Sequence, residues 1–234
     1  MAVLATTAHE PHRTGNRLRD VILGGQDGLV NMLGIILGVV AAGGSTTVLI
    51  AAGLAAAITE SISMGAVAYT STLSDRDYYR AEEAREREEM RTMPEVEREE
   101  IREIYAAKGF RGPQLDMVVE TITSDPEVWL RVMMEEELHL QPVDTTDVLR
   151  SAAIVTVACL IGHLLPLVPF MILARTPAVI AALLLSAVTL FGVGAYGALT
   201  RIGDWRAAGL RMVAIGLGSA ALGFLVSRLI GARG

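Results

Sequence analysis

The length of its apolar stretches restricts the possible folds of this chain more than any other feature of the sequence. As helices, these stretches are long enough to cross a lipid bilayer. Residues 28–74 hold a single charged side chain, that of Glu60. A helix needs only about 20 apolar residues to cross the hydrocarbon core of a membrane. The mean hydropathy of the whole chain is +0.44. This pattern disfavours a soluble single-domain enzyme and favours an integral membrane protein.

Five apolar runs predict the fold class. An open-ended segment satisfies its backbone hydrogen bonds in lipid only as a helix, so we expect an all-α protein with five transmembrane helices. A short turn at 43–46 predicts that the first two spans form an antiparallel hairpin. Prolines at 166 and 169 predict a kink in the third span. The runs cover residues 21–43, 48–74, 151–174, 176–200 and 207–230.

The charged residues gather between the second and third spans. Residues 75–149 contain 21 of the 26 acidic residues but only 10 of the 20 basic ones. An acidic segment of this kind repels phosphates, which disfavours nucleic-acid binding. No helix breaker interrupts the second span before Met93, so one helix should continue from the membrane into water. Breakers beyond it predict three further helices, at about 94–105, 113–123 and 126–140.

Basic residues near the ends of the spans predict the orientation. Most of them fall on the side that carries the N-terminus and the acidic segment, and that side should be cytoplasmic. The domains expected are a tail at 1–20, spans at 21–74, a cytoplasmic helical metal-binding domain at 75–149, spans at 150–230 and a tail at 231–234. Arginine outnumbers lysine by 19 to 1, so we expect a bacterial plasma membrane rather than a vacuolar one.

Asp27 and Glu60 are the acids inside the predicted spans. An unpaired carboxylate there costs roughly 2.5–3.5 kcal/mol on insertion, so neither side chain should face lipid. Asp27 could pair with Arg19 or cap a helix, whereas Glu60 has no cation within a turn. Met64 follows Glu60 by four residues and shares its helix face. A carboxylate beside a thioether suits a divalent transition metal better than Ca²⁺ or Mg²⁺.

The acidic segment repeats that mixture of donors. Two pairs of glutamates at i, i+3 spacing each place two carboxylates on one helix face. Two methionines and a glutamate share a face of the last predicted helix. The alternative is a solvated helix surface crossed by salt bridges. The candidate ligands are Glu86, Glu89, Glu97, Glu100, Met133, Met134 and Glu137.

At these residues the chain resembles the vacuolar iron transporter family, which moves Fe²⁺, and often Mn²⁺, out of the cytosol. The resemblance covers about residues 17–230. It rests on Asp27-Gly28-Leu29, Ser61-Ile62-Ser63-Met64-Gly65, the Glu-rich insert, and Trp129-Leu130 followed by Met133, Met134 and Glu137. The resemblance implies a homodimer, an ion pathway lined by the first two spans, and exchange of Fe²⁺ for protons.

The resemblance also implies roles for single residues. Asp27 and Met64 fall on the transmembrane aspartate and methionine of the family, and the seven candidate ligands of the insert fall on its cytoplasmic metal-binding residues. One position departs from the pattern. The family often has a glutamate where this chain has Ala56, and we infer that Glu60, one turn later, replaces it. One turn moves a carboxylate by about 5.4 Å along the helix axis.

The function expected is export of a divalent transition metal by proton antiport, with Asp27, Glu60 and Met64 in the pathway. The substrate is Fe²⁺, or Mn²⁺, Co²⁺ or Zn²⁺. No prosthetic group and no catalytic residue are expected. The partners are lipid, metal ions, protons and a second copy of the chain. The alternatives are a membrane-anchored ferroxidase or iron store and a metal sensor. Glu136-x-x-His139 resembles half of a di-iron site, but such a site needs this motif twice.

Overall fold

The computed structural model describes residues 13–146, 148–200 and 203–231. The described residues form helices joined by turns, with no strand among them. The chain divides into two compact units. One, called the apolar unit here, consists of Met1–Tyr69 and Leu149–Gly234, and the other, called the insert, is Thr70–Val148. Most of the tail expected at 1–20 and most of that at 231–234 lie outside the described residues.

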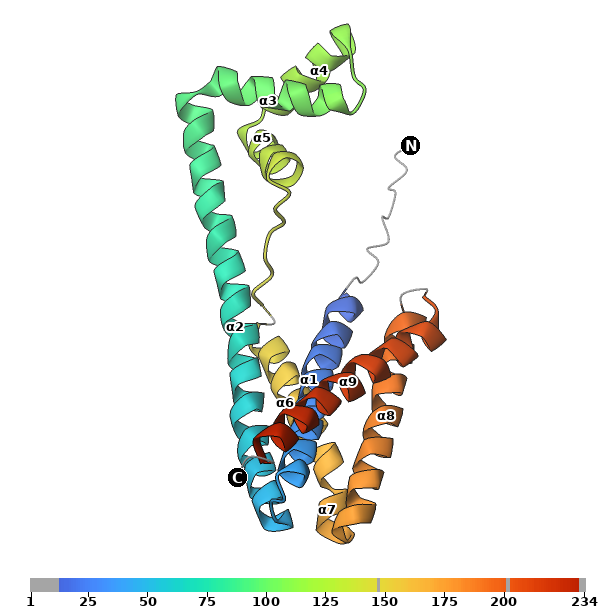
Figure 1. Ribbon diagram of the computed structural model, residues 1–234. Helices are drawn as coiled ribbons and strands as arrows, with labels where there is room; N and C mark the ends of the chain where they lie inside the picture. Colours follow the sequence, from blue (N-terminus) through green and yellow to red (C-terminus); the bar gives the residue numbers. More distant parts are fainter. Residues whose placement is uncertain (1–12, 147, 201–202, 232–234) are drawn as a thin grey trace, which may run out of the picture. The chain divides into compact units, whose positions relative to one another are not determined.

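Five helical segments are long and apolar enough to cross a membrane, as the sequence predicts. They are Leu18–Ala41, Thr46–Thr92, Val148–Ile172, Arg175–Leu199 and Trp205–Ile230. The first belongs to helix α1 (Arg13–Ala41) and the second is helix α2 (Thr46–Thr92). The turn between them contains Gly43 at φ +75°, a conformation that favours glycine. The long α2 confirms that the second span continues as one helix beyond its apolar part (Figure 1).

The third segment is divided where its prolines fall. Helix α6 (Val148–Leu167) ends just beyond Pro166, and the single turn α7 (Pro169–Ile172) begins at a proline. Proline lacks the N–H that would continue the helical hydrogen bonds, and its ring clashes with the preceding turn. Val168, between α6 and α7, keeps helical dihedral angles, and its N–H lies 3.1 Å from the carbonyl oxygen of Leu164. The prolines therefore interrupt the third span only locally, and Val148–Ile172 remains one span. The last two segments are α8 (Arg175–Leu199) and α9 (Trp205–Gly231).

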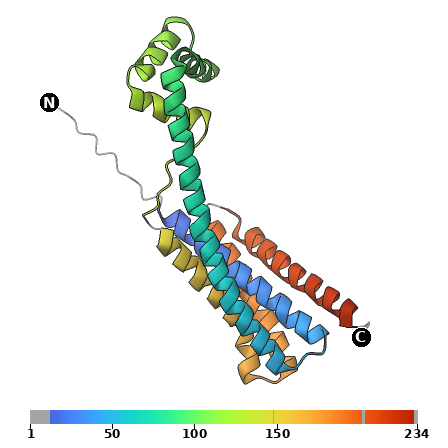
Figure 2. The ribbon, with the colours of Figure 1, turned by 90° about the vertical axis from the view of Figure 1, so that its left-hand side faces the viewer.

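The core of the apolar unit joins five helices. Buried side chains from α1, α2, α6, α7 and α8 form one apolar cluster: Met32, Ile36, Leu49, Ala57, Leu167, Phe170, Ala178 and Ala182. Helix α9 packs against α1 and α8, and Figure 2 shows it running beside α1. The outward faces of these helices carry many exposed apolar side chains, as expected for surfaces that meet lipid.

Helices α1 and α6 approach most closely at Gly28. A β-carbon added there would lie 2.3 Å from the carbonyl oxygen of Cys159 and 2.5 Å from Nδ1 of His163. No side chain fits in that space, and small residues are what allow membrane helices to pack this closely. Gly28 therefore helps to determine how near α6 comes to α1, together with Gly24 and Gly162, where an added β-carbon would lie 2.5 Å and 2.4 Å from backbone oxygens of the other helix.

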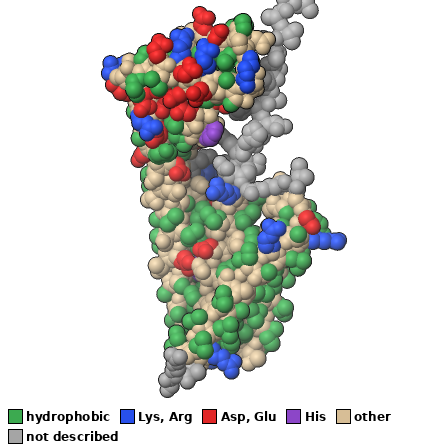
Figure 3. All heavy atoms as spheres, turned by 45° about the horizontal axis from the view of Figure 1, so that its top comes forward, with side chains coloured by type: hydrophobic (Ala, Val, Ile, Leu, Met, Phe, Trp, Pro, Cys, Tyr) green, Lys and Arg blue, Asp and Glu red, His purple; other side chains and the backbone are tan. Residues whose placement is uncertain are grey.

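The insert has its own apolar core. Helices α3 (Pro94–Ala107), α4 (Gly112–Thr123) and α5 (Pro126–Val132) follow the polar half of α2. Asp125 caps α5 by accepting hydrogen bonds from the backbone N–H groups of Glu127 and Val128, as its position predicts. The core of the insert contains Ile101, Leu115, Val119, Ile122, Trp129 and Met133. Charged side chains crowd the surface of the insert, whereas the apolar unit is largely covered by apolar ones (Figure 3).

The single helix expected at 126–140 is wrong in its second half. Helix α5 ends at Val132, and a π-helical turn, η1 (Met133–Glu137), replaces the next α-helical turn. His139 follows with φ +54°, a left-handed conformation that ends the helix. The wider turn changes the direction in which the side chains after Val132 project, which helical spacing alone did not predict. Turns of this kind often occur at functional sites.

The close approach at Gly28 can be tested by adding one methyl group. We expect Gly28→Ala to lower the melting temperature of the protein in detergent by about 2–12 °C, because overpacking of this kind costs about 1–3 kcal/mol. Gly34→Ala, on the same helix, is the matched control, since nothing lies within 4 Å of a β-carbon there. Equal melting temperatures for the two variants would contradict this account of the packing.

Candidate metal sites in the apolar unit and in the insert

A chain of polar side chains, partly exposed at Glu60, links α1, α2 and α6 in the apolar unit. His163 of α6, fully buried, places Nε2 2.8 Å from Oε2 of Glu60 on α2. The other oxygen of Glu60 accepts a hydrogen bond from the side-chain amide of Asn31 on α1. The same amide nitrogen lies 3.4 Å from Oδ2 of Asp27. The structure thus brings Asp27 and Glu60, from different helices, to the two sides of one amide group.

The opposite end of the His163 ring faces the backbone. Its Nδ1 lies 2.9 Å from the carbonyl oxygen of Cys159, one turn earlier on α6. A carbonyl oxygen only accepts hydrogen bonds, so this contact is a hydrogen bond in the tautomer that carries its proton on Nδ1. The sulfur of Cys159 lies 3.6 Å from the same nitrogen. The ring is therefore held in one orientation, with Nε2 directed at Glu60.

Sequence reasoning did not find His163 or Asn31. Asn31 lies four residues after Asp27 on α1, a spacing that brings two side chains to one helix face. His163 was an ionisable side chain in an apolar run, and such residues in membrane spans usually have a partner. The sequence thus contained a signal for each of the two residues. It did not show that His163 is a partner of Glu60, because the two lie on different helices, 103 residues apart. Local spacing cannot reveal such a pair.

Met64 and Ala56 lie one turn after and one turn before Glu60 on α2. Both are half-buried. The face of α2 that carries Glu60 thus presents a methionine on one side of the carboxylate and only a methyl group on the other. The role of Met64 in the pathway stays a prediction.

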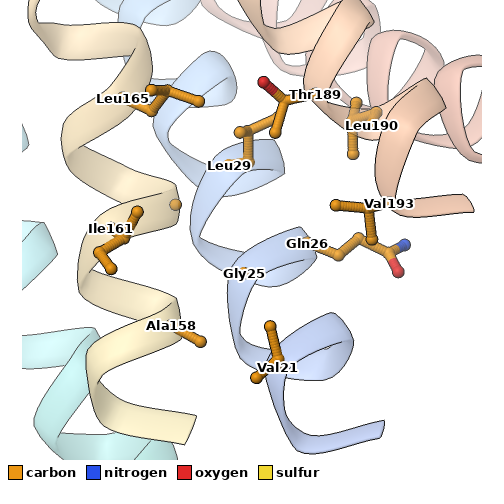
Figure 4. Close-up of a pocket in the computed structure, with 11 residues that line it drawn as sticks. Val21, Gly25, Gln26, Leu29, Ala158, Ile161, Leu165, Thr189, Leu190 and Val193 are labelled. Carbon is orange, nitrogen blue, oxygen red and sulfur yellow. The ribbon is translucent and has the colours of Figure 1, made fainter. Parts of the chain in front are cut away.

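A separate pocket of about 180 Å³ lies between α1, α6 and α8 (Figure 4). Its walls are mostly aliphatic, with Gln26 and Thr189 as its polar side chains. Gly25 and Leu29 line it, and each is two residues from Asp27, which places them on the opposite side of α1 at 100° per residue. This pocket therefore does not contain the polar chain.

In the insert, three glutamates from separate helical elements come together. Carboxylate oxygens of Glu86 on α2, Glu97 on α3 and Glu137 on η1 lie within 4.8 Å of one another. Glu86 and Glu97 are only 2% and 3% exposed. One oxygen of each is buried without a hydrogen-bond partner among the described residues. Buried polar atoms normally have such partners, so this group is arranged to receive a proton or a metal ion.

The other two predicted glutamates lie close enough to act on this group. Burial is the main cause that raises the pKa of Glu97 to about 7, and the charges of Glu100, Glu86, Glu89 and Glu137 raise it further. Burial likewise raises the pKa of Glu86, in the polar part of α2, to about 7, with Glu137 and Glu89 adding to the effect. The pKa of Glu137 is raised for the same reasons. Five carboxylates therefore form one coupled group, called the carboxylate cluster below.

One nearby cation partly balances the negative charge of the carboxylate cluster. Arg85 lies 3.7 Å from Glu89 and 2.9 Å from Glu82, and its charge lowers the pKa of Glu86 and Glu137. One guanidinium shared with Glu82 does not balance five carboxylates. Many other charges of the insert form exposed salt bridges, such as that of Arg87 with Glu127, as the alternative of a solvated surface predicted. The carboxylate cluster is distinct from these because two of its members are buried.

The predicted methionines are both buried but differ in their surroundings. Met133 is part of the apolar core of the insert, with Ile101 and Trp129. Met134 is 1% exposed and lies outside that core cluster. Both stand in η1, the turn that also carries Glu137. Their role as ligands stays a prediction.

Glu136 and His139, the residues that resemble half of a di-iron motif, do not join the carboxylate cluster. Glu136 forms an ion pair with Lys108. His139 is exposed, and its ring nitrogen lies 3.4 Å from the carbonyl oxygen of Glu135. The group of three carboxylates within reach of one ion includes neither residue. This arrangement gives the ferroxidase alternative no support.

The raised pKa values predict how the stability of the metal-free insert depends on pH. The folded pKa of Glu86 and Glu97, about 7, lies above the value of 4.5 for a free glutamate. The folded insert therefore binds more protons than the unfolded chain between these values, and its free energy of unfolding falls as the pH rises through that window. With chelator present, we expect the melting temperature to fall by at least about 5 °C from pH 5 to pH 8, and Mn²⁺ to restore it at pH 8.

The fluorescence of Trp129, in the core of the insert, measures this transition once Trp205→Phe has removed the other tryptophan. Glu97→Gln should flatten the pH dependence, because it removes one of the buried titrating groups. Glu99→Gln, at an exposed position of the same helix, is the matched control. A melting temperature that stays constant between pH 5 and pH 8 would show that ionisation of the carboxylate cluster does not destabilise the folded insert.

Comparison with known proteins identifies the family of the chain. Residues 18–228 match the profile of the VIT family. "Vacuolar iron transporter 1" of Arabidopsis thaliana is 34% identical over 187 residues, which are 79% of this chain and 75% of that protein. "Vacuolar iron transporter 2" of Oryza sativa subsp. japonica is 35% identical over 187 residues, 78% and 76% of the two chains. "Vacuolar iron transporter" of Plasmodium falciparum is 30% identical over 155 residues, 65% and 57%. This chain therefore belongs to the VIT family, a family of transporters rather than enzymes.

Proposed function

We propose that this protein carries Fe²⁺, and Mn²⁺ as a second substrate, out of the cytosol in exchange for protons. The observation that carries the proposal is the polar chain from Asp27 to His163 inside helices long enough to span a membrane. A protein whose helices serve only as an anchor has no need to place two carboxylates there. The names of the relatives, which specify iron, support the choice of metal.

The carboxylate cluster of the insert is the proposed collecting site. Its unpartnered oxygens on Glu86 and Glu97 offer an anionic, partly dehydrated environment to a divalent cation. Oxygen ligands alone also suit Mg²⁺ and Ca²⁺, so discrimination requires softer donors. Met134 and Met133 are the nearest candidates along the chain, since both share η1 with Glu137.

The transport step is proposed to occur at Asp27, Glu60 and Met64. A divalent cation and protons compete for the same carboxylate oxygens, because each neutralises their charge. Entry of a metal ion from the cytosol would release the protons held there, and protonation from the other side would release the metal. The exchange of one M²⁺ for two H⁺ leaves the net charge of the site unchanged.

The surroundings of the protein follow from the same proposal. The basic residues beside the spans support a cytoplasmic insert and N-terminus, and the arginine-rich composition supports a bacterial plasma membrane. We propose that two copies of the chain form the transporter. The side chain of Glu60 is 32% exposed in the single chain, which leaves it accessible to a pathway on the surface of α2.

Metal flux into proteoliposomes tests the proposal. With a pH gradient imposed, we expect the unchanged protein to transport Fe²⁺ and Mn²⁺ while protons move the opposite way, reported by a lumenal pH dye. Glu60→Ala should lower the flux at least tenfold, since it removes a ligand and a proton site together. Glu99→Gln, at an exposed position of the insert, should transport at the normal rate.

Two other results would overturn parts of the proposal. Flux without proton movement would mean that metal transport is not coupled to protons. Metal binding without flux, together with oxygen consumption on addition of Fe²⁺, would assign the protein to storage or oxidation instead.

A further inference from the structure

The polar chain contains two side chains to which the proposed transport step assigns no role, the amide of Asn31 and the imidazole of His163. The imidazole is the one that can bind a metal through nitrogen. It is fully buried in α6, in a span that sequence reasoning left without any functional residue. A histidine so placed requires partners for both ring nitrogens. Those partners are a backbone carbonyl at 2.9 Å and a carboxylate oxygen at 2.8 Å.

The carbonyl partner resembles the support that metal-binding histidines usually have. Such histidines commonly donate the N–H of one nitrogen to a backbone carbonyl or a carboxylate, which leaves the other nitrogen as the ligand. In His163, Nδ1 faces the carbonyl oxygen of Cys159 and Nε2 faces Glu60. Binding a metal through Nε2 requires that the ion replace any proton shared between this nitrogen and the carboxylate. Gly28 leaves the room that the ring occupies, since a β-carbon there would lie 2.5 Å from Nδ1.

Nε2 also lies in a position from which it could bind a metal ion. A transition-metal ion with ligand distances of about 2.1 Å holds neighbouring ligand atoms about 3.0 Å apart in octahedral and about 3.4 Å apart in tetrahedral coordination. Nε2 of His163 and Oε2 of Glu60 are 2.8 Å apart. A few tenths of an ångström of movement by Glu60, which is partly exposed, would admit an ion between them. Asn31 holds the other oxygen of Glu60, so the carboxylate stays close to the ring.

We propose that His163 is a direct ligand of the transported ion, and that it binds through Nε2 beside Glu60. The inference rests on the proposed transport of a divalent metal, and it adds the chemical class of the metal that is transported. An imidazole nitrogen suits Fe²⁺, Co²⁺, Zn²⁺ and, less strongly, Mn²⁺, whereas Mg²⁺ and Ca²⁺ prefer oxygen. The membrane site therefore selects transition metals by a nitrogen donor that comes from the third span, not only by the residues of the first two.

A protein with a single histidine provides the sharpest test. The chain has four histidines, and His9→Gln, His12→Gln and His139→Gln leave His163 alone. Glu86→Gln, Glu97→Gln and Glu137→Gln then remove the carboxylate cluster as a competing site. The full-length protein in detergent is loaded with one equivalent of Co²⁺, and X-ray absorption at the cobalt edge shows whether an imidazole ring is bound.

We expect the outer-shell scattering of one imidazole in this protein. Replacing its last histidine, by His163→Gln, should abolish that signal and weaken Co²⁺ binding by at least tenfold. If that variant fails to fold, the single-histidine protein still decides the question by itself. A bound cobalt with only oxygen or sulfur neighbours, or no bound cobalt at all, overturns the inference.

Flux separates this inference from the proposed function. Proteoliposomes with the three histidine substitutions but an intact carboxylate cluster are assayed for Mn²⁺ and Ca²⁺. Mn²⁺ flux without an imidazole on cobalt would leave transport standing and refute the role of His163. An imidazole on cobalt without flux of either ion would leave the ligand standing and refute transport. We expect both the imidazole signal and a preference for Mn²⁺ over Ca²⁺ that His163→Gln lowers at least tenfold.

Discussion

A carboxylate taken out of water needs a cation or hydrogen-bond donors, and the rest of this structure depends on how that need is met. The apolar unit and the insert meet it differently. In the apolar unit, each oxygen of Glu60 has a partner, the side-chain amide of Asn31 on one side and the ring nitrogen Nε2 of His163 on the other. In the insert, Glu86 and Glu97 each keep one buried oxygen without a hydrogen-bond partner among the described residues. These two carboxylates of the insert are therefore less compensated than Glu60.

This difference suits two stages of one process. A site whose charge is not compensated attracts cations, and raised pKa values make its occupancy a competition between protons and metal. A carboxylate that already has partners binds a cation only if the cation displaces those partners or uses them as further ligands. Such a site is suited to distinguishing between cations rather than merely attracting them. Helix α2 carries residues of both kinds, Glu60 in its apolar part and Glu86 in its polar part, because one helix continues between them without a break.

Much of the architecture follows from local patterns. Apolar runs of sufficient length predict the five long helices, and the lack of a breaker between Leu54 and Met93 predicts the length of α2. The insert helices were predicted from Pro94, Pro113 and the helix-start signal at residues 124–127, with Ser or Asp as the cap. The spacing of the glutamates indicated which residues could come together. The π-helical turn at Met133–Glu137 was not predicted. It depends on how the helical hydrogen bonds rearrange once neighbouring segments pack.

The sequence by itself determined where the helices run and which acids had to find partners, because hydrophobic length and helical spacing are local properties of the chain. Only the tertiary structure decided what those partners are. His163 reaches Glu60 because Gly28 lets α6 lie against α1 without an intervening side chain, and Glu137 reaches Glu86 and Glu97 because the insert folds three separate helical elements around one apolar core. Contacts between residues 40 to 103 positions apart arise from packing, and packing is not visible in any local pattern.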